Sequence, residues 1–95
     1  MIRAALMATV LAGCGAALPT ATPTDAARAH VELADLQRGR SLLLARCGSC
    51  HTPPMPGSRP ANTWPKELDA MAPRAGITLV QRHLIEAYVM TMATR

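Results

Sequence analysis

The most informative part of this 95-residue chain is the sequence Cys47-Gly48-Ser49-Cys50-His51. Two cysteines separated by two residues and followed directly by a histidine are typical of the attachment of a c-type haem. The two thiols add across the two vinyl groups of the haem, so they must lie a fixed short distance apart. The histidine is then held beneath the iron and ligates it through an imidazole nitrogen. The motif therefore predicts one covalent haem held by Cys47, Cys50 and His51.

The cysteine pair alone has other interpretations. A C-x-x-C sequence also occurs in zinc sites and in thioredoxin-like redox pairs. A zinc site in this chain would draw on Cys47, Cys50, His51 and His83. Signs of export and of helices on both sides of the motif favour haem over zinc.

The first residues resemble an export signal. Arg3 supplies a positive charge, and residues 4–12 are a short apolar stretch. This stretch is too short for a stable membrane span. It ends in Leu11-Ala12-Gly13-Cys14, which resembles a bacterial lipobox, the sequence at which a signal peptide is cut before a cysteine that then receives lipid. We expect a signal peptide at residues 1–13; cleavage of an ordinary signal near Ala16 or Ala17 is the alternative.

The cysteine count agrees with lipidation of Cys14. The chain has three cysteines, and the haem motif uses two of them. The third would be a lone thiol in an exported protein, which calls for an explanation. A lipid on Cys14 would anchor the protein to a membrane on the periplasmic side of a bacterial cell envelope.

A linker and a small domain are expected after Cys14. Residues 14–32 are rich in Ala, Thr and Pro without apolar periodicity, which predicts a flexible, lipidated N-terminal tether. Residues 33–95 are the predicted domain. A domain of this size has a marginal hydrophobic core, and the chain has no Phe, one Trp and one Tyr. A buried haem would supply a large apolar disc for the core to pack around.

The segment before the motif has helical periodicity. Asp35 is a candidate N-cap for a helix that runs to about Arg46. The residues at helical spacing along one side of this helix are Leu36, Gly39, Leu43 and Cys47. A glycine within a helix usually has a packing reason, such as the close approach of another helix.

Two more helices are expected after the motif. Four prolines in residues 53–60 disfavour a helix there. A short helix should begin at Asn62 or Thr63, with Pro65 in its first turn, and end near Ala72 because Pro73 follows. Thr78 and Gln81 form a capping-box pattern that opens a last helix to about Ala93. No strand pattern is visible, so the predicted class is small and all-α.

With these features the chain resembles a small monohaem class-I-type cytochrome c over about residues 35–92. The residues that carry the resemblance are Gly39, Leu42 and Leu43 before Cys47, and Tyr88-Val89 in the last helix. The resemblance implies about three helices packed around one covalent haem, with Tyr88-Val89 packing on the first helix at Gly39. An aromatic residue is common in the family where Leu43 stands. The short middle of the chain resembles a compact subset, with a Trp-Pro start and a Met on a short helix.

The sixth ligand of the iron is expected to be Met71. It follows His51 at a distance that lets the chain pass around the haem edge, and the compact subset also resembles this placement. Met55 is too close to His51 to reach the opposite face. Met90 and Met92 lie on the last helix, where methionine usually fills the core. His83 is the competing ligand, although a solvated surface histidine is the simpler interpretation.

Three further residues are candidates for contacts with the haem propionates. The indole N–H of Trp64 can donate to a propionate, or Trp64 can serve packing alone. Arg59 and Arg74 flank the expected distal segment and can pair with propionates; exposure to solvent is the alternative for both.

Composition and charge favour an electron carrier over an enzyme. The net charge is +4, and no basic cluster indicates nucleic acid binding. The six carboxylates show no pairing of the kind that hydrolytic catalysis needs. We therefore expect a membrane-anchored electron-transfer protein with His/Met-ligated haem c and redox proteins as partners. A haem-based sensor or gas-binding protein with an open sixth site, and an accessory haem subunit of a larger membrane oxidoreductase, remain alternatives.

Overall fold

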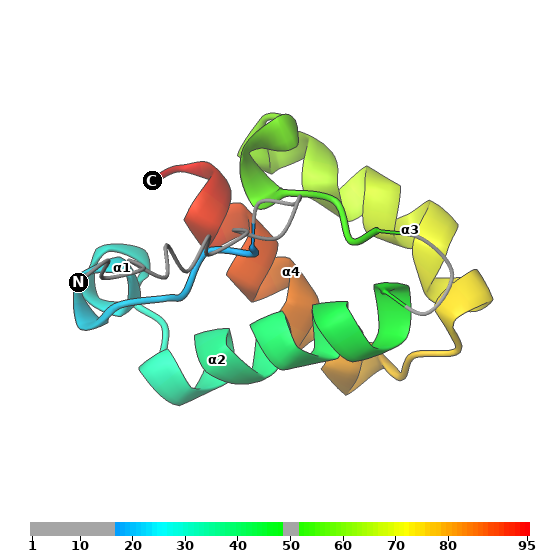
Figure 1. Cartoon of the computed structure of the whole chain (residues 1–95), viewed down its shortest axis with the longest axis horizontal. Helices are drawn as coiled ribbons and strands as arrows, with labels where there is room; N and C mark the ends of the chain where they lie inside the picture. The colour runs from blue at the N-terminus through cyan, green and yellow to red at the C-terminus, as the bar shows by residue number, and fades with distance from the viewer. Residues whose placement is uncertain (1–16, 49–51) are drawn as a thin grey trace, which may run out of the picture.

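The computed structural model describes residues 17–48 and 52–95. All regular secondary structure in these two ranges is helical (Figure 1), which confirms the all-α class. The α-helices are α1 (Pro23–Ala29), α2 (Leu33–Leu42), α3 (Trp64–Ala75) and α4 (Leu79–Ala93). The shorter helices are the π-helical η1 (Leu43–Cys47), which continues α2, and the 3-10 turns η2 (Pro56–Ser58) and η3 (Ala61–Thr63). Three of the four α-helices match the predicted ones, and α1 was not expected.

Helix α4 begins where the sequence predicts it to begin. The backbone N–H of Gln81 donates to Oγ1 of Thr78 at 3.1 Å, and the N–H of Thr78 donates to Oε1 of Gln81 at 2.9 Å. This reciprocal capping box satisfies two donors that a helix start otherwise leaves without partners. The apolar residues buried on α4 are Leu84, Ile85, Tyr88, Val89 and Met92.

The central packing contact of the fold is the crossing of α2 and α4, in which α4 passes behind α2 in Figure 1. The predicted buried side of the first helix is confirmed, because Leu36, Gly39, Leu43 and Cys47 are all buried. A Cβ atom on Gly39 would overlap the carbonyl oxygen of Leu84 and lie 2.8 Å from Cβ of Tyr88. Gly39 is therefore the residue that lets the two backbones approach.

Two predicted helix boundaries are wrong. Asp35 is not the N-cap of α2; that position belongs to Glu32, whose carbonyl accepts from the N–H groups of Asp35 and Leu36. Asp35 lies in the first turn, where a carboxylate interacts favourably with the helix dipole. Helix α3 continues through Pro73 and ends at Ala75, before Gly76 in the left-handed conformation. The proline removes one helical hydrogen bond close to the end of the helix, where the loss is small.

The described part of the predicted linker is not a free tether. Residues 18–30, which we call the N-terminal strap, contain α1 and pack against the domain. Leu18, Ala21 and Ala26 are buried in the same core as the residues of α2 and α4. A prediction of flexibility from composition was wrong here because small residues such as Ala lie close against the domain. The ordered part of the chain thus begins well before residue 33.

Long-range hydrogen bonds fix the strap to α2 and α4. The hydroxyl of Tyr88 donates to the carbonyl of Pro19 at 2.5 Å. The guanidinium of Arg40 donates from Nε and Nη2 to the carbonyl of Leu18, at 3.2 and 3.1 Å. Burial raises the pKa of Tyr88, which keeps its hydroxyl protonated as a donor. The strap is therefore held through its backbone carbonyls as well as by apolar contacts.

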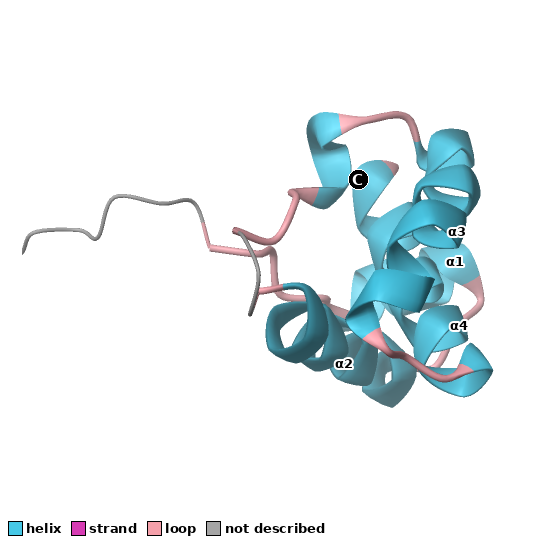
Figure 2. Cartoon of the chain, turned by 90° about the vertical axis from the view of Figure 1, so that its right-hand side faces the viewer, coloured by secondary structure: helices cyan, strands magenta, loops and turns pink. Residues whose placement is uncertain are grey.

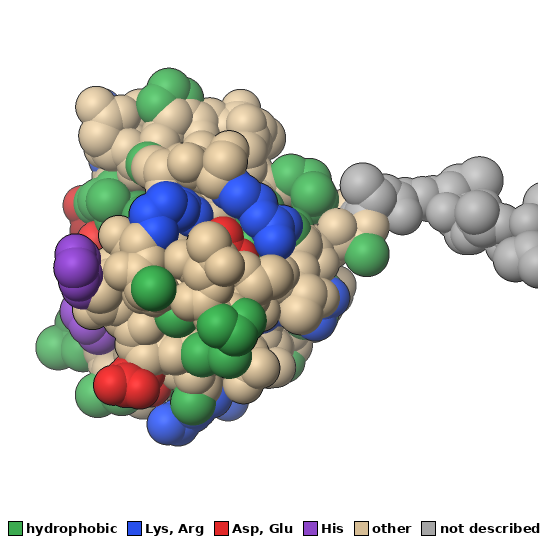
Figure 3. Space-filling model, turned by 90° about the vertical axis from the view of Figure 1, so that its left-hand side faces the viewer, with side chains coloured by type: hydrophobic (Ala, Val, Ile, Leu, Met, Phe, Trp, Pro, Cys, Tyr) green, Lys and Arg blue, Asp and Glu red, His purple; other side chains and the backbone are tan. Residues whose placement is uncertain are grey.

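Asp25 joins the strap to the C-terminus. The backbone N–H and the hydroxyl of Thr22 donate to Oδ2 of Asp25 at 2.8 and 2.9 Å. Arg28 and Arg95 pair with the same carboxylate at 3.2 and 3.4 Å, and Figure 3 shows basic side chains on both sides of an acidic one on this face. These groups, with the hydrogen bonds from Thr22 as the largest cause, hold the pKa of Asp25 below its ordinary value of 3.8.

Replacement of Gly39 by alanine should destabilise the protein by about 1 to 3 kcal/mol, because the added methyl group forces α2 and α4 apart. Thermal unfolding followed by circular dichroism measures the effect. Gly57→Ala is the matched control, since a Cβ at Gly57 meets nothing within 4 Å. Equal melting temperatures for the two variants would show that the crossing is not tightly packed.

The lowered pKa of Asp25 predicts a pH-dependent contribution to stability. The ionised carboxylate stabilises the folded state at pH values above its ordinary pKa of 3.8, and this contribution is lost as the pH falls through the lower pKa of the folded state. Asp25→Asn should therefore unfold at a lower temperature than the parent protein at neutral pH, with a smaller difference in acid. Asp69→Asn is the control, because Asp69 forms an exposed ion pair with Arg82 that contributes little. A difference between parent and Asp25→Asn that is constant with pH contradicts the assignment.

Candidate haem-attachment site

Cys47 and Gly48 are the residues of the motif that the structure describes. Cys47 is the last residue of η1, directly after the part of α2 that crosses α4, and its side chain is buried. The N–H of Gly48 donates to the carbonyl of Leu44 at 3.2 Å and closes the helix end. Ser49, Cys50 and His51 lie outside the described residues, as do Cys14 and the predicted signal peptide. The continuation of α2 into η1 thus places the first cysteine of the motif at the edge of the core.

The segment after the motif is irregular, as its prolines predict. Residues 52–55 have no helix, and η2 and η3 are each a single turn. Pro56 occupies the first position of η2, where the missing N–H of proline removes no helical hydrogen bond. The path of residues 52–63 leads from the motif to the start of α3 (Figure 1).

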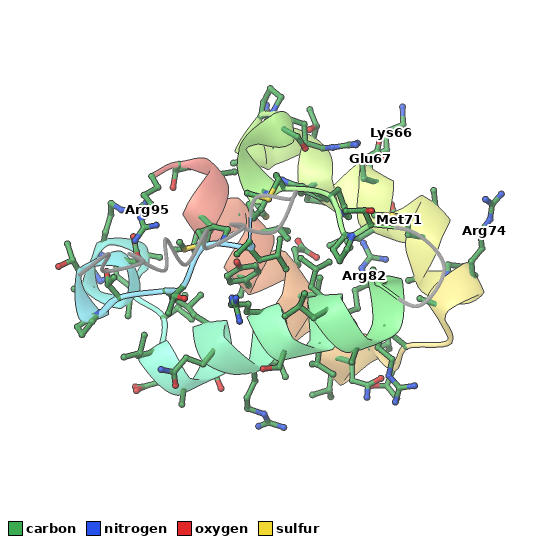
Figure 4. The ribbon with its side chains drawn as sticks, viewed as in Figure 1. Lys66, Glu67, Met71, Arg74, Arg82 and Arg95 are labelled. Carbon is green, nitrogen blue, oxygen red and sulfur yellow. The ribbon has the colours of Figure 1, made fainter. Side chains whose placement is uncertain are left out.

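Met71 lies on α3 and is half-buried against the core (Figure 4). Lys66 and Arg74 of the same helix point away from the molecule, so Met71 belongs to the inner part of α3. Met55 and Met90 are also half-buried, and Met92 is buried. A half-buried thioether on a short helix is compatible with the predicted role of Met71, and its ligation to iron stays a prediction.

Trp64 is fully buried, and its indole N–H donates to the carbonyl of Pro56 at 3.0 Å. An indole has a single N–H, so its donor is already used by the protein. The structure therefore favours the packing interpretation of Trp64 over the predicted bond to a propionate.

Arg59 stacks on Trp64 and has an unused donor. Its guanidinium carbon lies 4.9 Å from the centroid of the Trp64 ring, a cation–π geometry. Its Nη1 pairs with Glu67 at 2.8 Å, while its Nε is buried without a hydrogen-bond partner. Buried donors normally have partners, so Arg59 is the better candidate of the two arginines for a propionate contact. Arg74 is exposed.

The remaining histidines lie at the surface. His83 is exposed on α4, which agrees with the solvated interpretation, and His30 is exposed at the end of α1. In residues 17–48 and 52–95, no three His, Cys, Asp or Glu side chains come together as a metal site. Cys50 and His51 lie outside these ranges, so this observation concerns other metal sites and leaves the predicted haem site untested.

The residues that hold the strap were not predicted from the sequence. Arg40, Asp25 and the hydroxyl of Tyr88 make the bonds that tie residues 18–30 to the domain. One local signal was present: Thr22, Pro23 and Asp25 have the spacing of a capping box with proline at the first helical position.

Comparisons with known proteins give no relative. No family model, no curated protein and no solved structure matches this chain. Within the two described ranges, every helix is too short or too polar to cross a lipid bilayer.

Trp64→Phe tests the packing role of Trp64. The variant leaves the buried carbonyl of Pro56 without its donor, which should cost about 1 to 3 kcal/mol of stability. Chemical denaturation measures this loss. If Trp64 serves packing alone, the visible spectrum of the folded variant should match that of the parent. A change of spectrum with unchanged stability would instead indicate a contact between Trp64 and a bound chromophore.

Proposed function

We propose that this protein is a membrane-anchored electron-transfer protein of a bacterial cell envelope that carries one covalent haem c. The observation that carries the proposal is the C-x-x-C-H motif, whose first cysteine, Cys47, is buried at the end of a helix packed into the core. Cys47 and Cys50 would hold the haem, and His51 and Met71 would fill the two axial positions.

The chemistry of the residues in and around the motif supports such a group. The donor set combines two thiols, an imidazole and a thioether, which is a recognised set for haem c. Apolar and half-buried side chains, among them Met55 and Met71, pack against the core on the elements that flank the motif. The buried Nε of Arg59 is a donor without a partner, which a propionate would satisfy.

Filled axial positions favour electron transfer. A haem held in this way supplies a one-electron couple. With His51 and Met71 both bound to the iron, no coordination position is open to a substrate or gas. A thioether ligand raises the reduction potential relative to a second imidazole, and the lipid on Cys14 would keep the carrier beside membrane-bound redox partners.

Haem attachment is tested by the pyridine haemochrome spectrum of the purified, mature protein. Cys50→Ala leaves at most one thioether bond, so its haemochrome band should shift relative to the parent. Cys14→Ser is the control, since it removes the lipidation site and should leave the band unchanged. A parent protein that is colourless and folded would overturn the proposal, and an unshifted band in Cys50→Ala would overturn the attachment scheme.

The axial ligand is tested by Met71→Ala. Ferric cytochromes with a methionine ligand show a weak sulfur-to-iron absorption at the red end of the visible spectrum, a trait of the family that this chain resembles. Met71→Ala should abolish this band, and Met90→Ala, a half-buried methionine on α4, should retain it. Persistence of the band in Met71→Ala assigns the ligand to another methionine. A parent protein with five-coordinate ferrous iron and ready binding of CO would favour the sensor alternative.

A further inference from the structure

Among the described residues, Leu18 is the first that is fixed to the rest of the domain. Its side chain is buried in the core, and its carbonyl accepts two hydrogen bonds from Arg40. The next carbonyl, that of Pro19, accepts from the buried Tyr88. Two successive backbone groups and one apolar side chain therefore hold the chain at residues 18 and 19.

The distance from this point to the predicted lipid-bearing residue is short. Leu18 lies four positions after Cys14, and four fully extended residue steps span at most about 14 Å. A free linker over residues 14–32 would instead have a root-mean-square length of roughly 24 Å. The strap thus replaces a long, loose tether by a short one.

We propose that the strap holds the domain directly against the lipid surface, with one defined face toward the membrane; this inference rests on the proposed lipidation of Cys14. The occupant of that face is the lipid bilayer that takes up the acyl chains of Cys14. The length of the chain between Cys14 and Leu18 leaves no room for a second protein layer between domain and membrane.

The face toward the membrane is the one that carries residues 17–19. In Figure 1 residues 17–19 lie near the end of the 52–55 loop that leads into η2, and in Figure 2 both segments are on the side of the molecule away from α3. This loop directly follows the C-x-x-C-H motif. The side chains exposed on these two segments include Ala17 and Thr52, and neither segment has an acidic residue.

The charge distribution suits an anionic lipid surface. Residues 36–66 contain no Asp or Glu. Their basic residues on the elements before the motif are Arg38, Arg40 and Arg46; Arg59 pairs with Glu67, and Lys66 lies on α3, away from this face. Basic residues close to an anionic leaflet are attracted to it. The part of the chain around the motif can therefore approach lipid headgroups without charge repulsion.

Neutron reflectometry of the full-length, mature protein on a supported bilayer tests this inference. The bilayer contains phosphatidylcholine with a minority of phosphatidylglycerol. The parent protein should lie against the headgroups, with a water layer no thicker than about 14 Å. A variant with about 20 Gly and Ser residues inserted between Ala16 and Ala17 has an added root-mean-square reach of about 25 Å and should show a clearly thicker water layer. Equal water layers for the two proteins would overturn the inference.

A second variant lengthens the tether without an insertion. Arg40→Met combined with Tyr88→Phe removes the three hydrogen bonds to Leu18 and Pro19 while keeping the apolar side chains in the core. The folded double variant should also show a thicker water layer than the parent. Arg38→Met, an exposed residue on the same helix, is the control and should behave like the parent. A double variant that behaves like the parent would contradict the role of these three hydrogen bonds in setting the distance.

Two further measurements on the same sample separate this inference from the proposed function. Mass spectrometry of the N-terminus reports acylation of Cys14, and the optical spectrum reports haem. An unacylated Cys14 overturns the membrane inference and leaves the haem function standing. An acylated, colourless protein with a thin water layer supports the membrane inference and overturns the electron-transfer proposal.

Discussion

The close contact between α2 and α4 at Gly39 is the constraint on which the rest of the structure depends. The carbonyl of Leu84 and the Cβ of Tyr88 occupy the space that any larger residue at position 39 would need. Their approach buries Leu36 and Leu43 of one helix against Ile85 and Val89 of the other. Because η1 continues α2, this crossing also fixes the position of Cys47, the last residue of η1.

Trp64 fixes the position of the segment that leads from the motif to α3. Its ring is fully buried, its N–H binds the carbonyl of Pro56, and Arg59 stacks on it while pairing with Glu67. One aromatic side chain thereby ties η2, the loop before α3 and the first turn of α3 together. The chain has one Trp, one Tyr and no Phe, and both aromatic side chains are fully buried in the core.

Features governed by local chemistry were predictable from the sequence. The capping box at Thr78 and Gln81 depends on residues three positions apart, and the buried side of α2 depends on helical spacing; both were confirmed. The strap was missed because bonds to distant side chains hold it: Arg40 and Tyr88 lie 22 and 69 positions from their acceptors. The course of α3 through Pro73 was missed because a proline near a helix end is tolerated when a glycine closes the helix.

In the candidate site, too, the local features were predictable from the sequence and the long-range contacts were not. The C-x-x-C-H motif is local, and its chemistry follows from five consecutive residues. The structure adds the burial of Cys47 and the half-buried position of Met71. For Trp64 the sequence left two roles open, and only the position of the Pro56 carbonyl decides between them.

The bonds between the strap and the last helix determine the order in which the protein assembles. Arg28 donates to the carbonyl of Thr91, 63 positions away, and Asp25 pairs with the final residue, Arg95. A chain that emerges from a ribosome or a translocation channel with its N-terminus first exposes the strap long before these partners arrive. Strap closure therefore requires α4 and Arg95 to be present, and until then Leu18 and Ala21 have no completed core to enter.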